Sequence, residues 1–159
     1  MKTRSKILLT SLCATLGVAL HSCASLGTPE DQAMGNALWT TIQGYHDWDS
    51  PPDWEGFQPS KSPHGKFVKV YVNSTLASNL DAPPAGSIVV KEGFSKEDQD
   101  SIKAITVMQK VEGYGADAGG WFYSRYSPSG KMTHAGTPGM CADCHASAGG
   151  DDFLYINDY

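Results

Sequence analysis

Apolar and polar residues alternate along several stretches in the middle of the chain, as they do in half-buried β-strands. In the first stretch Val68, Val70 and Val72 share one side. Four stretches are predicted as strands: residues 67–73, 87–92, 102–111 and 121–126. Segments rich in Gly, Pro, Asp and Ser separate them and predict turns. We therefore expect a sheet of short strands rather than a bundle of long helices.

A helix is predicted before the first strand, from about Thr28 to about Gly44. Thr28 can cap it, Pro29 suits the first helical position, and two acidic residues follow at the positive end of the helix dipole. An apolar stripe at a spacing of four residues indicates packing against the core; it consists of Met34, Leu38 and Ile42.

Lys91 is an unusual residue for its position in the second predicted strand. Strand alternation places it on the same side as Val89. A lysine on a buried side must reach solvent, lose its charge or be used chemically. Taken alone, the pattern favours a strand-end lysine that reaches solvent.

The N-terminus has the features of an export signal. Lys2, Arg4 and Lys6 precede an apolar run over residues 7–20. This run is shorter than the roughly 20 residues of a membrane span. The residues before Cys23 resemble a bacterial lipoprotein signal, so we slightly favour acylation of Cys23 over cleavage after Ala24. We expect an export signal over residues 1–23 and one soluble domain over residues 28–159, located in the periplasm or lipid-anchored to the outer membrane.

The composition limits the classes of molecule that this domain can bind. The net charge is −5 and the pI is about 5.4, so no basic stripe is available for nucleic acid. Hydrophobic residues make up 40% of the chain, which is enough for a core. We expect contact with a membrane only through the lipid anchor.

The strongest chemical motif is Cys141-Ala142-Asp143-Cys144-His145. A Cys-x-x-Cys-His sequence is typical of covalent c-type haem attachment, with the two thiols joined to the porphyrin and the histidine bound to the iron. Cys13 and Cys23 lie in or beside the predicted signal, so no disulfide framework is expected.

The cysteine pair has two other interpretations. Half a zinc site would need two further ligands, for which His46, His64 and His134 are the candidates. A thioredoxin-type redox pair should follow a strand and open a helix in a βαβ unit, whereas residues 136–139 suggest a turn. Both are weaker than haem attachment.

The chain resembles the cytochrome P-460 family, which includes the cytochromes c′-beta. The resemblance runs in order over most of residues 30–157 and is carried by these segments: Pro63-His64-Gly65, Val70-Tyr71-Val72-Asn73, Val89-Val90-Lys91-Glu92, Ile105-Thr106-Val107-Met108, Glu112-Gly113-Tyr114, Gly120-Trp121-Phe122 and Cys141-Ala142-Asp143-Cys144-His145-Ala146. It implies a single α+β domain with an antiparallel sheet and flanking helices, usually a homodimer. It also implies one covalent haem c, five-coordinate, that binds small ligands at its open face.

Residue by residue, the resemblance assigns Cys141 and Cys144 to the thioether bonds and His145 to the iron. Lys91 matches the lysine that is linked to the porphyrin edge in P-460 proteins, a link that favours oxidation of hydroxylamine. These enzymes also use a carboxylate, in the segment shortly before the haem motif, to take a proton from the substrate. No Asp or Glu occurs over residues 119–142, and His134 is the candidate base in its place.

Three functions follow, in order of preference. The first is oxidation of hydroxylamine, with or without nitric oxide, to nitrogen oxides, with electrons passed to a partner cytochrome. The second is binding or detoxification of nitric oxide or carbon monoxide, with Phe67 or Phe94 as a wall of the pocket. The third is electron transfer, with Met132, Met140 or His134 as sixth ligand of the iron.

Overall fold

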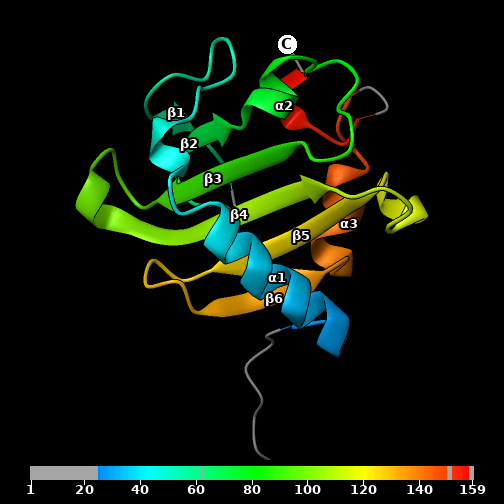
Figure 1. Ribbon diagram of the computed structural model, residues 1–159. Coiled ribbons are helices and arrows are strands. Elements are labelled where there is room, and N and C mark those ends of the chain that lie inside the picture. Colours follow the sequence, from blue (N-terminus) through cyan, green and yellow to red (C-terminus); the bar gives the residue numbers. More distant parts are fainter. Residues whose placement is uncertain (1–24, 62, 150–151, 158–159) are drawn as a thin grey trace, which may run out of the picture.

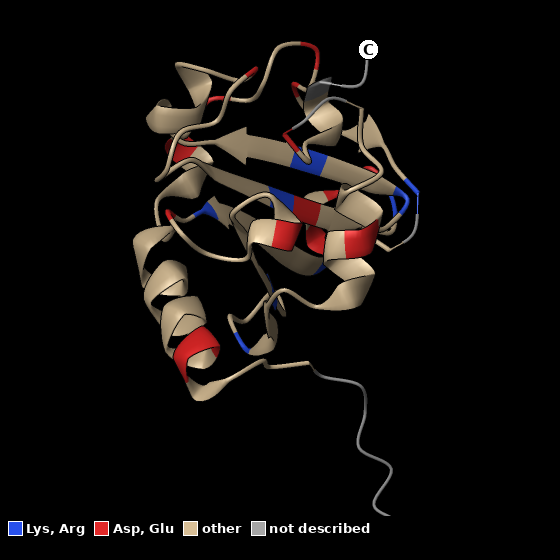
Figure 2. Ribbon diagram, turned by 90° about the vertical axis from the view of Figure 1, so that its right-hand side faces the viewer, with Lys and Arg blue, Asp and Glu red and all other residues tan. Residues whose placement is uncertain are grey.

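The computed structural model describes residues 25–61, 63–149 and 152–157 (Figure 1). The predicted export signal, residues 1–23, lies outside the described residues. No helix among those described is long and apolar enough to span a membrane. Figure 2 shows Lys and Arg scattered over several elements of this part of the chain rather than gathered in one stripe.

The described residues form a six-stranded antiparallel sheet in which the strands follow one another in chain order. The strands are β1 (Gln58–Pro59), β2 (Phe67–Val72), β3 (Ile88–Phe94), β4 (Ile102–Lys110), β5 (Trp121–Tyr126) and β6 (Met132–Gly136). The α-helices are α1 (Pro29–Thr41), α2 (Ser74–Ala77) and α3 (Gly139–His145). Short 3₁₀ turns are η1 (Tyr45–Asp47), η2 (Gln99–Ser101), η3 (Ala116–Ala118) and η4 (Tyr155–Asn157). The expected α+β class with an antiparallel sheet and flanking helices is confirmed.

The four predicted strands are all present, and two strands were missed. β1 is only two residues long, and β6 mixes small and polar residues without a clear alternation. β6 exists because its backbone pairs with β5, a long-range contact that a local pattern does not report.

Helix α1 begins as predicted and ends before Gly44. The Thr28 side chain accepts from the backbone of Asp31, and Asp31 accepts from the backbone of Thr28, which forms a capping box. The predicted stripe is confirmed, because Leu38 and Ile42 are buried.

The sheet separates two cores. α1 covers one face, and α3 lies on the other face (Figure 1). The larger side chains beneath α1 are Ile88, Val90, Ile105, Val107, Phe122 and Tyr126. Those on the α3 side include Val68, Val70, Val72, Val89, Trp121 and Tyr123.

The strand register places a row of polar residues across the α3 face. Lys91 pairs with Thr106, Thr106 with Arg125, and Arg125 with His134. Directly paired residues of antiparallel strands point to the same face. The row therefore crosses β3 to β6 on the side that carries α3.

Candidate functional site

The cysteine motif lies on α3, close behind β6. Cys141 and Cys144 are three positions apart on this helix, so their side chains share one side of it. Both are free thiols. The motif follows β6 closely and lies on a helix, whereas the sequence indicated only a turn over residues 136–139 before it. A thioredoxin-type unit is still excluded, because β5 and β6 are antiparallel and form no βαβ unit.

His145 has one ring nitrogen engaged and one left free. Its Nδ1 lies 2.8 Å from the carbonyl oxygen of Phe153. A carbonyl oxygen only accepts, so Nδ1 carries the proton and Nε2 keeps its lone pair. Burial lowers the pKa of His145, and Lys91 lowers it further against the effect of the Phe153 hydrogen bond. The imidazole is thus held neutral and oriented as a metal ligand requires.

A cavity opens between α3, the C-terminal segment and the sheet. Its walls combine the motif with the polar row of the sheet: Cys141, Cys144, His145, Lys91, Thr106, Arg125 and His134. Apolar residues such as Val89 and Leu154 complete it.

Lys91 faces this cavity from within β3, which continues to Phe94. The interpretation as a strand-end lysine that reaches solvent is therefore wrong. Burial lowers the pKa of Lys91 to about 8, against an opposing effect of Cys144. Among the described residues its ammonium group has no hydrogen bond or ion pair. The structure thus brings Lys91 together with the cysteine pair and His145.

His134 lines the same cavity and is 8% exposed. Burial lowers its pKa, and the charge of Arg125 lowers it further. No described residue that lines the cavity is Asp or Glu, in agreement with the carboxylate-free segment. His134 and Arg125 make this side of the cavity basic and leave His134 as a base candidate.

Four residues of the cavity were missed as site residues: His64, Thr106, Tyr123 and Arg125. Strand alternation assigns Thr106, Tyr123 and Arg125 each to one side of its own strand. Only the strand register shows that these sides and that of Lys91 form one face of the sheet. His64 lies in the loop before β2, where no periodic pattern exists. It was named in the sequence only as a zinc candidate and as part of the segment Pro63-His64-Gly65 that carries the resemblance.

Three of the proposed pocket residues, Met132, Phe67 and Phe94, are not among the described lining residues. Met132 packs against the core beneath α1, on the opposite face of the sheet, so it cannot be a sixth ligand. Met140 lines the cavity but is 61% exposed. Phe94 packs against Phe57, with ring centroids 4.9 Å apart.

The cavity fits haem better than zinc. The hydroxyl group of Tyr123 is buried in its wall without a hydrogen-bond partner, as expected of a site completed by another molecule. Arg125 supplies positive charge next to apolar walls, which suits a flat apolar ring bearing carboxylates. The described residues contain no cluster of three or more His, Cys, Asp and Glu that could hold a metal ion. One zinc candidate, His46, instead pairs with Glu92.

An antiparallel sheet with such a cavity beside a Cys-x-x-Cys-His helix defines a haem-binding cytochrome. The family model described as Cytochrome P460 matches residues 42–156. The chain therefore belongs to the cytochrome P460 family, which implies a haem cofactor. No curated protein matches the chain.

Proposed function

We propose that this protein is an exported mono-haem c-type cytochrome that oxidises hydroxylamine, with or without nitric oxide, to nitrogen oxides. The observation that carries the proposal is the position of Lys91, whose side chain enters the cavity lined by the cysteine pair and His145. A lysine without a partner beside the haem site is what a lysine-to-porphyrin link requires.

The α3 motif holds the haem. The thiols of Cys141 and Cys144 each form a thioether bond to one porphyrin, and His145 binds the iron through Nε2. When bound, the haem supplies an iron that accepts electrons from hydroxylamine. Both thiols lie on the same side of a short helix, so a single flat ring can join them without moving the sheet.

Lys91 would hold the haem at a second point, the edge of the porphyrin. That link would replace a hydrogen on Nζ and a hydrogen on a ring carbon by an N–C bond, with an oxidant of the peroxide class taking up both hydrogens. Burial favours the neutral amine of Lys91, which is the form that bonds to carbon.

The remaining polar groups handle protons and charge. His134 accepts a proton from hydroxylamine, the role for which the cavity offers no carboxylate. Arg125 lies beside His134 on the paired strand and keeps it neutral and ready to accept. The electrons leave to a partner cytochrome in the periplasm, and the protein acts as a homodimer.

Peptide mass spectrometry of the exported holoprotein tests this proposal. We expect a protease fragment that contains Lys91 to remain joined to the haem-bearing fragment 141–145, and the joined mass to vanish in Lys91→Met. His134→Ala should then lower hydroxylamine oxidation at least tenfold while the link persists. Separate fragments in the wild-type protein would contradict the link.

Reversible binding of nitric oxide or carbon monoxide is the second candidate function. The observation in its favour is the absence of Asp and Glu from the described cavity lining, since gas binding needs no base. Separate Lys91 and haem fragments, together with tight gas binding, would make it the preferred function. The same mass spectra report whether Cys23 is acylated.

A further inference from the structure

The C-terminal segment, residues 152–157, is bonded to the end of α3, where His145 lies. The carbonyl oxygen that accepts from His145 Nδ1 belongs to Phe153 of this segment. The ring of Tyr155, also in this segment, packs edge-on against the imidazole, with the two ring centroids 5.5 Å apart. The segment therefore holds the imidazole by both a hydrogen bond and a ring contact.

Phe153 has an unusual backbone conformation. Its φ is 63°, in the left-handed region that a bulky residue rarely adopts. Such a conformation persists only where the surroundings enforce it, and it is common at functional sites. Here the Phe153 ring lies directly on Gly119, where an added Cβ would be 2.5 Å from the ring. This enforced conformation is the one in which the Phe153 carbonyl reaches His145.

The residues on either side of Phe153 are fixed to the sheet side of the cavity. Trp121 Nε1, on β5, donates to the carbonyl oxygen of Asp152 at 2.8 Å. The backbone of Leu154 donates to the carboxylate of Asp152 at 2.9 Å, and the Leu154 side chain is buried in the core. The beginning of the segment is thus anchored independently of α3.

Tyr155 ties the rest of the segment to α3. Its hydroxyl donates to the carbonyl oxygen of Cys144 at 2.8 Å. The same hydroxyl lies 2.8 Å from Ser147 Oγ and 3.7 Å from Cys144 Sγ. Tyr155 therefore joins the segment to the second cysteine of the motif, the residue directly before His145 in the sequence.

We propose that Tyr155 is a positioning residue that holds the Phe153 carbonyl against His145, so that the C-terminal segment sets the strength of the iron–histidine bond and the reduction potential of the haem. A hydrogen bond from Nδ1 makes the imidazole a stronger electron donor, which favours ferric over ferrous iron. The proposal rests on the haem attachment and the axial role of His145 proposed above, not on the Lys91 link or on hydroxylamine as substrate. It leaves the face of the iron opposite His145 open.

Resonance Raman spectra and the reduction potential of the full-length holoprotein test the proposal. Tyr155→Phe keeps the ring but removes the hydroxyl. We expect a lower iron–histidine stretching frequency in the ferrous protein, because the Phe153 carbonyl is held less firmly. The equilibrium should shift toward ferrous iron by about threefold, which raises the potential. Tyr155→Leu also removes the ring contact and should shift both values further in the same direction.

Gly119→Ala reaches the same carbonyl by a second route. The added Cβ displaces the Phe153 ring and leaves Tyr155 and the cysteine motif unchanged. We expect the frequency and the potential to shift in the same directions as in Tyr155→Phe. The matched control is Tyr126→Phe, which also removes a hydroxyl that donates to a backbone carbonyl, but on the opposite face of the sheet. Its frequency and potential should equal those of the wild-type protein.

A denaturing gel stained for covalent haem separates the outcomes. Wild-type frequency and potential in both Tyr155→Phe and Gly119→Ala, with covalent haem present, would overturn the proposal and leave the segment a purely structural role. A wild-type protein without covalent haem would overturn the proposed function and this proposal with it. The expected shifts in a protein that does not oxidise hydroxylamine would support this proposal and contradict only the proposed substrate.

Discussion

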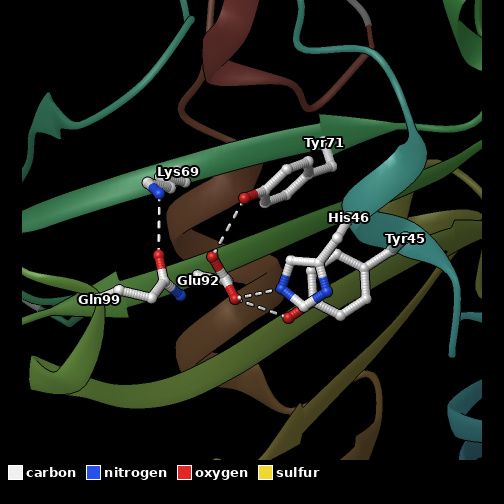
Figure 3. Close-up of polar contacts among 6 residues, drawn as sticks. All are labelled: Tyr45, His46, Lys69, Tyr71, Glu92 and Gln99. Atoms are coloured by element: carbon white, nitrogen blue, oxygen red, sulfur yellow. Dashed lines mark hydrogen bonds and ion pairs between the residues drawn. The ribbon is translucent and has the colours of Figure 1, made fainter.

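Lys91 and Glu92 are neighbours on β3 that point to opposite faces of the sheet, and their surroundings differ sharply. Glu92 is 1% exposed and lies in a complete set of partners (Figure 3). It accepts from Tyr45 Oη at 2.7 Å and Tyr71 Oη at 3.3 Å, and its Oε1 lies 3.0 Å from His46 Nε2. Lys91 has no hydrogen bond or ion pair among the described residues.

The difference distinguishes polar groups that are hydrogen-bonded within the protein from polar groups that have no partner in it. Burial, then the charge of Glu92, raise the pKa of Tyr71 to about 12, and the same causes raise the pKa of Tyr45. Both phenols therefore stay protonated and donate to the carboxylate. On the other face the buried hydroxyl of Tyr123 is left without a partner, and the ammonium of Lys91 has no hydrogen bond or ion pair among the described residues. Both groups line the cavity that is assigned to the haem.

The largest effect is expected from the removal of Glu92. Glu92→Ala should lower the free energy of unfolding by about 3 kcal/mol, because two buried phenols lose their acceptor. Glu92→Gln keeps an acceptor and should lower it by about 1 kcal/mol. Denaturant unfolding of the holoprotein measures both values, and the haem spectrum should not change.

Lys91→Met is the matched substitution on the opposite face. It removes a buried charge without breaking a contact, so the free energy of unfolding should stay within about 1 kcal/mol of wild type while the haem spectrum changes. Equal losses from Glu92→Ala and Lys91→Met would refute the distinction between the two faces.

His46→Ala should change the free energy of unfolding by less than about 1 kcal/mol, since the His46 side chain is 57% exposed.

A smaller loss is expected where α1 is held to its face of the sheet. Tyr126 donates from its hydroxyl to the carbonyl oxygen of Gly35 at 2.6 Å, and both residues are buried. Tyr126→Phe should lower the free energy of unfolding by about 1 kcal/mol, because the Gly35 carbonyl loses its donor. Trp39 packs on the same ring and remains as a packing contact. A loss as large as that of Glu92→Ala would mean that the phenyl ring had also moved, which the fluorescence of Trp39 would report.

How much of this was visible in the sequence depends on the range of the interaction. The helix cap at Thr28 and the alternation of β2 are local, and the structure contains them as predicted. The row from Lys91 to His134 depends on the register of four strands, and the position of His64 depends on a loop docked onto Gly93. Local periodicity assigns a residue to a side of its own strand but not to a common cavity.

A pH-dependent effect on stability is expected at the start of α1, which covers the face of the sheet opposite the cavity. Burial acts to raise the pKa of Asp31, but hydrogen bonds from Tyr114 and Thr28 outweigh it, so this pKa lies below its usual range. The stabilisation by the charged form is therefore present above the ordinary carboxyl pKa and is lost as the pH falls through the lowered value. The difference in unfolding free energy between wild type and Asp31→Asn should shrink as the pH is lowered. A difference that is the same at neutral and acidic pH would show that the cap does not depend on this charge.

The smallest effect on stability is expected at Tyr123, in the cavity wall. Burial raises the pKa of Tyr123, with smaller effects of the two thiols, so its hydroxyl stays protonated, and that group has no hydrogen-bond partner. Tyr123→Phe removes a buried polar group without orphaning another, and replacements of that kind are nearly neutral. In the protein without haem we expect the free energy of unfolding to change by less than about 0.5 kcal/mol, compared with about 1 kcal/mol for Tyr126→Phe three residues further along β5. If Tyr123→Phe destabilises the holoprotein as much as Tyr126→Phe does, the Tyr123 hydroxyl has a hydrogen-bond partner in the bound haem. The comparison of the two variants with and without haem would locate that partner.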